Sequence, residues 1–197
     1  MKLFHLQQKL SKLKCFTPVD IRRYTGLSET AVQKIISRYI QKGIFVRLRN
    51  GLYMFKNTPF PPLWYIANKV YNPSYISFET ALAYYGFIPE SVYTIISATS
   101  KTTRNFEIID REFSYRKIKK EAFTGYKPIK IEDEIILFAE PEKALADYLY
   151  FVYLKKIRIN ERLKKTGIKK NILVKYIRTF KNKTFTEWNK NVIGKYY

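Results

Sequence analysis

Residues 17–55 carry helix and turn signals in an order that limits the fold more than any other feature of the chain. A short helix is predicted over Pro18–Thr25, because Thr17 can cap its N-terminus and Gly26 permits a tight turn after it. A second helix is predicted over residues 29–42, which lie between a serine that can serve as a cap and a glycine that can end the helix.

A β-hairpin is predicted directly after these two helices. The runs 45–48 and 52–55 are rich in apolar residues and flank the dipeptide Asn50-Gly51. Asn-Gly between two apolar runs is the strongest short-range hairpin signal. Two helices joined by a short turn and followed by a hairpin are the layout of a winged helix-turn-helix domain. We therefore expect an α+β chain whose first domain, residues 1–58, is a winged helix.

The second predicted helix has one apolar face and one polar face. Val32, Ile35 and Tyr39 recur at helical spacing, so their face is expected to meet the core. Glutamine can pair with the edge of adenine and arginine with that of guanine, while a serine at a helix N-terminus suits a phosphate. The polar face, the cations of the first helix and those of the hairpin form a candidate DNA-binding surface. Its members are Arg22, Arg23, Ser28, Thr30, Gln33, Lys34, Ser37, Arg38, Arg47 and Arg49.

The net charge of +21 is distributed unevenly along the chain. Residues 1–58 carry 12 Lys/Arg against 2 Asp/Glu, residues 59–150 carry 11 against 12, and residues 151–197 carry 14 against 2. Basic ends around a neutral middle indicate contact with a polyanion. Nucleic acid is favoured over a membrane, because no apolar run approaches the roughly 18 residues of a spanning helix. The expected partner is double-stranded operator DNA, bound as inverted repeats by a dimer or one repeat at a time by a monomer.

The segment 59–62 contains three prolines in four residues and is the expected boundary between two domains. An amphipathic helix at about residues 3–13 should complete the first domain, and the second domain, residues 59–197, should mix helices and strands. We predict helices at 63–70, 77–85 and 141–153, and strands at 92–98, 106–109, 113–117 and 135–138.

The end of this α/β domain is a basic helical tail, about residues 155–197, in which cations alternate with apolar residues. That mixture indicates two folded amphipathic helices, broken near Gly167 and Asn182, rather than a disordered arm. Three interpretations of the tail stay open. It could provide a second surface for DNA, meet an acidic protein, or simply be a lysine-rich solvated face.

The chain lacks the usual materials of a catalytic site, so we expect no enzyme, no metal and no cofactor. His5 and Cys15 are the only residues of their types, which argues against zinc sites and Cys–His or Ser–His nucleophile systems. A single cysteine also excludes an internal disulfide and fits the cytoplasm. One enzymatic alternative stays open, a metal-dependent nuclease using Glu132–Glu134 with Asp110 or Glu112. An acidic turn between two strands explains that triplet more simply.

Each of the two predicted domains also has a competing interpretation. The winged helix could bind a protein, or the regulator could carry an unrelated effector domain. Glu142 and Lys143 lie in the first turn of the predicted helix 141–153 and are expected to cap it and to pair at the surface. Ser77 is expected to cap the predicted helix 77–85, whose residues should belong to the core.

Four short segments carry a family resemblance through their order and spacing over residues 17–150. They are RNGLY at 49–53, YISFETAL at 75–82, YYGFIPE at 84–90 and AEPEKALAD at 139–147. Together they resemble the AbiEi family of antitoxins from type IV (abortive infection) toxin–antitoxin systems. The resemblance implies an N-terminal winged helix that represses its own operon and a C-terminal domain that counters a nucleotidyltransferase-like toxin in phage defence. The basic tail after Tyr150 is a departure from the family pattern.

Overall fold

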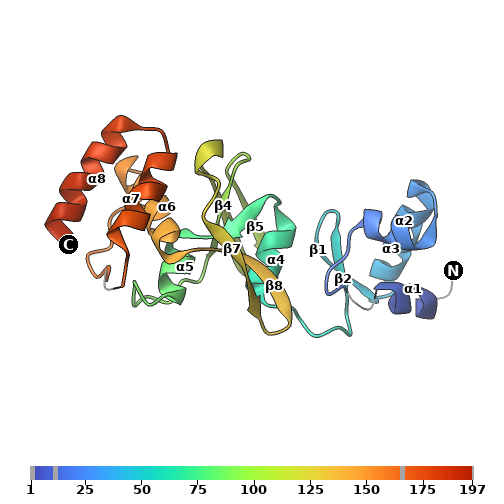
Figure 1. Cartoon of the computed structure of the whole chain (residues 1–197). Helices are drawn as coiled ribbons and strands as arrows, with labels where there is room; N and C mark the ends of the chain where they lie inside the picture. The colour runs from blue at the N-terminus through green and yellow to red at the C-terminus, as the bar shows by residue number, and fades with distance from the viewer. Residues whose placement is uncertain (1–2, 11–12, 165–166, 197) are drawn as a thin grey trace. The chain divides into compact units, whose positions relative to one another are not determined.

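The computed structural model describes residues 3–10, 13–164 and 167–196 (Figure 1). The chain divides into two compact units, residues 1–62 and 63–197, which are described separately. The mixed α+β architecture and the C-terminal helical tail expected from the sequence are confirmed.

The first unit consists of three helices and a two-stranded hairpin. Its elements are α1 (Leu3–Leu10), α2 (Pro18–Thr25), α3 (Glu29–Gln41), β1 (Phe45–Arg49) and β2 (Leu52–Phe55). One apolar cluster joins all of them, and it includes Leu6 and Leu10 from α1, Ile21 from α2, Ile36 from α3 and Phe45 from β1. Because this cluster draws on every element, no single helix could bury its apolar face alone.

Capping explains where α2 and α3 begin. The Thr17 hydroxyl accepts a hydrogen bond from the amide of Asp20 at 3.3 Å, while the Asp20 carboxylate accepts one from the amide of Thr17 at 2.8 Å. This reciprocal capping box was only half predicted, because the role of Asp20 was missed. Gly26 follows in the left-handed region with φ +68°, and the hydroxyl of Ser28 then caps α3.

The hairpin is antiparallel and contains one irregularity. Arg47 pairs with Tyr53 and Arg49 with Leu52, so the register shifts between the two arginines. Phe16 adds an isolated bridge, exchanging both backbone hydrogen bonds with Tyr53 at 2.8 and 2.9 Å. Phe16, which lies just before α2, therefore joins the hairpin. The sequence pattern predicts the first helix at about residues 3–13; the structure describes this helix over Leu3–Leu10, and Leu13 lies outside any helix.

The second unit is built on a six-stranded mixed sheet with strand order β5-β6-β4-β3-β8-β7. The pairs β4–β6 and β3–β8 are parallel and the others are antiparallel. The strands are β3 (Ser74–Ile76), β4 (Ile95–Thr99), β5 (Arg104–Ile108), β6 (Arg111–Lys117), β7 (Tyr126–Ile131) and β8 (Glu134–Ala139). The helices are α4 (Leu63–Val70), α5 (Phe78–Tyr84), the 3-10 turn η1 (Lys120–Ala122), α6 (Pro141–Tyr153), α7 (Lys170–Thr179) and α8 (Lys183–Tyr196).

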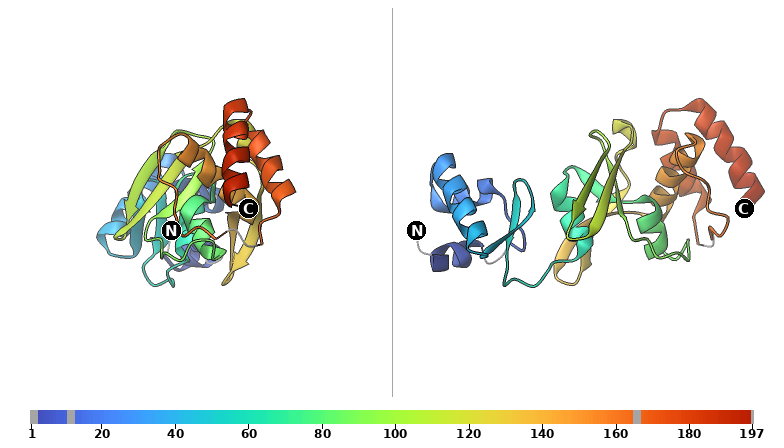
Figure 2. Two further views of the ribbon diagram at one scale, coloured as in Figure 1. Left: turned by 90° about the vertical axis from the view of Figure 1, so that its left-hand side faces the viewer. Right: turned by 180° about the vertical axis from the view of Figure 1, so that it is seen from behind.

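Helices cover the sheet on both faces (Figure 2). Helix α4 lies against one face, over β3, β4 and β8, while α5 and α6 lie on the other side, where α5 contacts β4. The tail helices α7 and α8 pack on α6. The predicted bounds of α4 and α6 are confirmed, and the tail holds two helices as expected.

Two strands were missed in the sequence. Strand β3 has only three residues and follows Asn72-Pro73 directly, which leaves no alternating pattern to recognise. Strand β7 contains Pro128, which argues against a central strand. Its place at the edge of the sheet makes the proline tolerable, because an edge strand has a free side on which no ladder bond is required.

Two local expectations in this unit are wrong. The Ser77 side chain makes no capping bond to α5 and instead donates to the carboxylate of Asp147 at 2.7 Å. Glu142 and Lys143 do not pair at the surface, because both are buried, with only 7% and 0% of their surface exposed to solvent. They are buried because α7 packs over the first turns of α6, which the sequence pattern of α6 alone does not reveal.

Candidate nucleic-acid interface

Helix α3 separates its side chains into a core face and a solvent face. Val32, Ile35, Ile36 and Tyr39 are buried in the unit 1 core. The candidate residues on and before this helix all lie on the exposed side. These are Ser28, Thr30, Gln33, Lys34, Ser37 and Arg38. The helix therefore presents amide, hydroxyl and cationic groups over more than two turns, which are the groups that read base edges and phosphates.

The first two hydroxyls of this surface have partners within the chain. The Ser28 hydroxyl accepts from the amide of Ala31 at 3.3 Å and lies 3.1 Å from the hydroxyl of Thr30. Ser28 acts as the helix cap, so a phosphate bound there would share this hydroxyl with the cap. Its main contribution would be to fix the helix N-terminus whose amides attract anions.

The cations of α2 lie beside this N-terminus. Arg22 is 4.0 Å from the carboxylate of Glu29, and both side chains are more than half exposed. Such a surface pair is worth about 0–1 kcal/mol, so Arg22 can exchange it for a phosphate at little cost. Arg23 is exposed as well. A shallow hollow at the turn is lined by Val19, Arg22, Arg23, Gly26 and Leu27.

Arg38 sits further along α3. Its guanidinium carbon lies 5.1 Å from the centre of the Tyr39 ring, whose other side belongs to the core. A cation–π contact of this kind restrains the arginine without removing its donors from solvent. Arg38 is thus held near the surface of the helix, on the same face as Lys34 one turn earlier.

The hairpin presents its two arginines unequally. Arg47 is exposed, whereas Arg49 is half-buried and takes part in an interaction within the chain. The register shift between them interrupts the strict alternation that would have placed both on one face. Of the ten candidates, Arg49 is the only one that the structure does not leave exposed.

The structure adds two candidates that the sequence did not suggest. Val19 is 59% exposed beside Arg22 and Arg23, where an apolar side chain could meet a thymine methyl or a sugar. Asn50 is exposed at the tip of the hairpin. Nothing in the residue types distinguishes these two positions, since an apolar residue on an amphipathic helix reads as core and an Asn-Gly pair reads as a turn.

The second unit holds a buried polar cluster between β3 and α6. The Lys143 ammonium lies 2.5 Å from the carboxylate of Asp147, and both side chains are 0% exposed. The same carboxylate accepts hydrogen bonds from the hydroxyls of Tyr75 at 2.9 Å and Ser77 at 2.7 Å. The Lys143 ammonium also lies 4.7 Å from the centre of the Phe180 ring.

Burial dominates the acid–base behaviour of this cluster. Loss of water raises the pKa of the Asp147 carboxyl, and the nearby Lys143 ammonium opposes that change. The same loss of water lowers the pKa of Lys143 against the effect of Asp147, and it raises the pKa of Tyr75 well above its ordinary value. Each group is satisfied by the others and enclosed, so the cluster resembles a structural network more than a reaction site.

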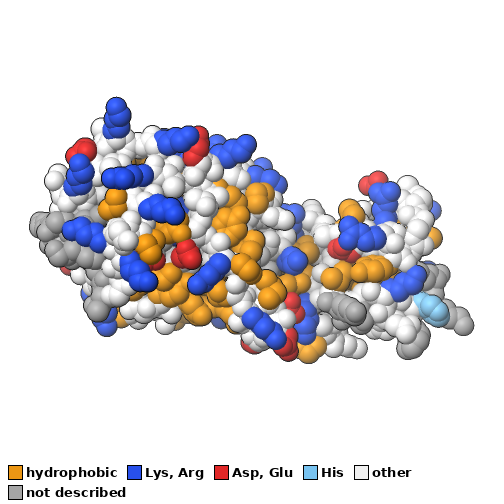
Figure 3. Space-filling view, viewed as in Figure 1, with side chains coloured by type: hydrophobic (Ala, Val, Ile, Leu, Met, Phe, Trp, Pro, Cys, Tyr) orange, Lys and Arg blue, Asp and Glu red, His pale blue; other side chains and the backbone are white. Residues whose placement is uncertain are grey.

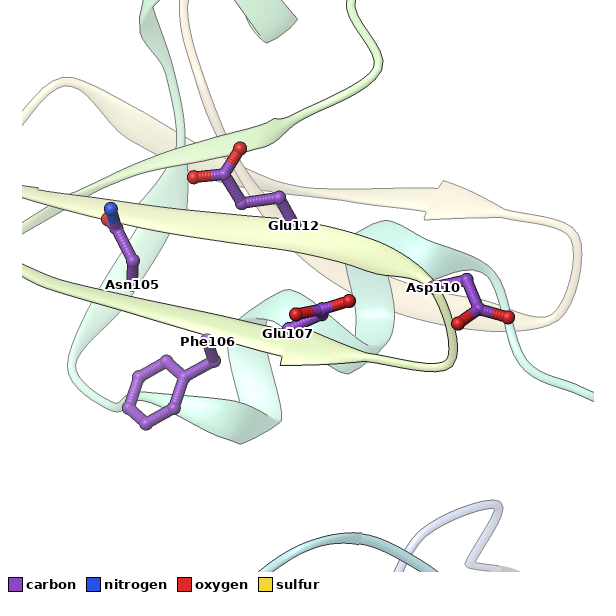
Figure 4. A pocket seen from close by; sticks show the side chains of 5 residues that line it. All are labelled: Asn105, Phe106, Glu107, Asp110 and Glu112. Carbon is purple, nitrogen blue, oxygen red and sulfur yellow. The ribbon is translucent and has the colours of Figure 1, made fainter.

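The acidic residues considered for a metal do not come together. Asp110 and Glu112 lie on the β5–β6 hairpin, while Glu132–Glu134 lie at the β7–β8 turn, at the opposite edge of the sheet. Around the β5–β6 hollow, the carboxylates of Glu107, Asp110 and Glu112 point in different directions (Figure 4). Within the described residues, no group of three His, Cys, Asp or Glu side chains could hold a metal ion.

Residues 6–56 match the family model described as a transcriptional regulator, AbiEi antitoxin. This stretch covers α2, α3 and the hairpin, which carry all ten candidate residues. No curated protein matches the chain. None of the described helices is long and apolar enough to cross a bilayer. Regulators of this kind are generally not enzymes. Over residues 6–56, this chain is therefore similar to the AbiEi family of antitoxin transcriptional regulators.

Proposed function

We propose that this protein is a DNA-binding repressor of its own operon, and that it acts as the antitoxin of a type IV toxin–antitoxin system. In this proposal the first unit is a winged helix, α3 enters the major groove of the operator, and the β1–β2 hairpin is the wing. The toxin would be a nucleotidyltransferase-like protein encoded in the same operon. The match to antitoxin regulators over residues 6–56 supports both halves of the proposal.

The observation that carries the DNA half is the composition of the exposed face of α3. Gln33, Lys34 and Arg38 share that face with three hydroxyl side chains, while the core side of the helix is filled by apolar residues. Amide and guanidinium groups can each make bidentate contacts with a base edge, worth about 1–3 kcal/mol of discrimination. A helix serving only as scaffold would not require this combination.

The charge of the first domain supports DNA over a protein as its partner. Residues 1–58 carry 12 Lys/Arg against 2 Asp/Glu, and one of the two acids, Asp20, is used as a helix cap. Neutralisation of phosphates by such cations is the main sequence-independent source of DNA affinity. An interface for protein would more commonly be depleted of lysine.

A DNase footprint on the promoter of its own operon tests the DNA half. The triple variant Gln33→Ala/Lys34→Ala/Arg38→Ala should lose operator protection while retaining its helical circular dichroism. A matched control, Lys42→Ala/Lys56→Ala/Asn57→Ala, removes the same two charges and one amide from exposed positions outside the proposed interface. If the control loses protection as strongly as the triple variant, or the triple variant retains it, α3 is not the recognition helix.

Co-expression tests the antitoxin half. Induction of the neighbouring gene of the operon should arrest growth, and expression of this protein should restore it. The Gln33→Ala/Lys34→Ala/Arg38→Ala variant should lose repression but keep the rescue, since the antitoxin activity is assigned to the second unit. Persistent arrest in the presence of the wild-type protein would disprove the antitoxin role.

A further inference from the structure

The β7–β8 hairpin leaves one of its two faces open to solvent. Among the described strands, β3 meets β8 only where Ile76 pairs with Phe138, so most of β8 pairs with β7 alone. Helix α4 packs over β8, and Ile136 is 0% exposed. Ile135 precedes it and points to the opposite face, where it is 58% exposed. A strand of this sheet thus directs a large apolar side chain into water.

Three apolar side chains share the open face, and we call them the hairpin patch: Pro128, Ile135 and Leu137. Pro128 pairs with Leu137 across the two strands, and Ile135 lies two residues before Leu137 on β8. Pro128 is exposed and Leu137 is half-buried. Figure 3 shows apolar side chains gathered over β7 and β8. Contiguous apolar surface of this kind marks a site of interaction with another molecule.

Helix α7 extends this apolar surface beyond the base of the hairpin. The ring of Tyr176 on α7 packs against Gly125, directly before β7, and its hydroxyl donates to the carboxylate of Glu140, directly after β8. Ile172 lies one turn earlier on α7, and both it and Tyr176 are half-buried. The apolar surface therefore begins near the tip of the hairpin and continues to α7.

Charged side chains of opposite sign lie at the two ends of this surface. The turn at the tip carries three acids, Glu132–Glu134. Lys130 borders the tip and lies 3.2 Å from the carboxylate of Asp133, so the tip keeps a net negative charge. At the other end, Lys169 and Lys175 are exposed, and they make no ion pair with any residue that the structure describes. The open face is thus acidic at its tip, apolar in its middle and basic beside α7.

The edge of β7 is protected against pairing with a strand of another molecule. Pro128 has no amide hydrogen, and Lys127 and Lys130 on this edge strand are exposed. Prolines and lysines on an edge strand are devices that prevent edge-to-edge association. A partner of this hairpin is therefore expected on its open face and not along its edge.

We propose that the open face of the hairpin is the interface of a symmetric dimer of this chain. A second copy turned by a twofold rotation presents the same surface in reverse order, because such an interface is self-complementary. The two hairpin patches then meet in the middle, and the acidic tip of each copy lies beside Lys169 and Lys175 of the other. An unrelated partner would need to carry this order of charges independently, whereas a second copy carries it by symmetry.

Sedimentation equilibrium of the full chain without DNA gives the first test. The wild type should dimerise with a dissociation constant on the order of 10 μM, as expected for a small interface. Ile135→Ser should raise this constant at least about 100-fold, because each dimer buries the side chain twice. The matched control Ile109→Ser replaces an isoleucine that is 51% exposed on the β5–β6 turn, and it should dimerise as the wild type does. A wild type that stays monomeric at about 100 μM, or an equal loss in the control, overturns the proposal.

Charge reversal tests the order of charges directly. The tip variant is Glu132→Lys/Asp133→Lys, and the base variant is Lys169→Glu/Lys175→Glu. Each should self-associate at least about tenfold more weakly than the wild type, since like charges then face each other. An equimolar mixture should form mixed dimers with nearly wild-type affinity, because opposite charges face each other again at both ends. Sedimentation of a fluorescently labelled tip variant with the unlabelled base variant measures this recovery.

Two controls make the same charge changes at exposed positions outside β7, β8 and α7. They are Glu107→Lys/Asp110→Lys and Lys56→Glu/Lys117→Glu, and both should dimerise as the wild type does. Circular dichroism and the thermal midpoint establish that each variant is folded. Tip and base variants that self-associate like the wild type, or a mixture that forms no mixed dimer, overturn the proposal.

These outcomes are separate from those of the proposed function, because dimerisation is measured without DNA. A dimer carries two copies of α3, which suits the two halves of an inverted repeat. A protein that dimerises but protects no operator supports this interface and refutes the DNA half of the proposed function. A monomer that protects its operator does the reverse.

Discussion

Replacing Lys143 with methionine leaves the fully buried carboxylate of Asp147 without its cation. The two hydroxyl donors, Tyr75 and Ser77, remain in place, so the variant keeps the hydrogen bonds to Asp147 but loses the charge 2.5 Å away. Methionine has a length similar to that of lysine and can occupy the space beside the Phe180 ring. The substitution therefore tests the ion pair with little change in volume.

The expected loss is large because one partner of a buried pair remains behind. Breaking such a pair costs about 3–5 kcal/mol of unfolding free energy at neutral pH. The loss should depend on pH. Without Lys143, the folded-state pKa of Asp147 rises further above its unfolded value, so the carboxyl binds a proton more tightly when folded. Stability is then retained at acid pH and lost as pH rises, by about 1.4 kcal/mol for each unit of pKa difference.

The converse substitution, Asp147→Asn, should show the opposite pH dependence. It leaves Lys143 buried without a counter-charge, which lowers the folded-state pKa of this lysine further below its unfolded value. The folded state then binds its proton less tightly than the unfolded state does, so stability increases as pH rises. The stabilities of the two variants should therefore change with pH in opposite directions: Lys143→Met should be least stable at high pH, and Asp147→Asn should be least stable at low pH.

Urea unfolding followed by tryptophan fluorescence measures the stability of the second unit, which contains the Lys143–Asp147 pair. The only two tryptophans, Trp64 and Trp188, both lie in the second unit. Measurements at pH 4.5 and 7.5 would compare both variants with wild type and with Lys170→Met, an exposed control that should change stability by less than about 0.5 kcal/mol. A loss below about 1 kcal/mol, or slopes of the same sign in both variants, would refute the account of the buried pair.

Two further substitutions test local features of each unit. Gly125→Ala should destabilise the second unit by about 2 kcal/mol or more in the same urea assay. The new Cβ would lie 2.5 Å from a Tyr176 ring carbon, and the backbone at this position has φ +76°. A variant as stable as the wild type would show that α7 does not pack there. Thr17→Ala should lower the stability of the first unit by about 1 kcal/mol, because it removes half of the α2 capping box. Calorimetry should show a lower midpoint for the thermal transition of the first unit, and an unchanged midpoint would rule out the cap as a stabilising feature.

Elements whose signals are local were predicted well. The bounds of α2, α4 and α6 follow from a cap or proline at the start and a break at the end, all within a few residues of sequence. The hairpin follows from a single dipeptide, Asn50-Gly51. The core face and the solvent face of α3 follow from one periodic pattern. In each case the information and the structure lie in the same short segment.

Features that join distant segments escaped prediction. Glu142 and Lys143 read as surface residues of an amphipathic helix, because nothing within α6 indicates that α7 covers its first turns. Ser77 reads as a cap because its partner Asp147 lies 70 residues further along the chain. The half-burial of Arg49 depends on a register shift between two strands, which residue types do not specify.

The sequence by itself determined the helix-turn-helix pattern, the hairpin and the basic character of both ends, because capping, turn formation and charge depend on residues close together in the chain. Tertiary structure alone decided which apolar side chains stay exposed on the β7–β8 hairpin and which polar groups meet inside the second unit. Those outcomes depend on how α6, α7 and the sheet pack, and packing sets burial, pairing and pKa through contacts between residues far apart in sequence.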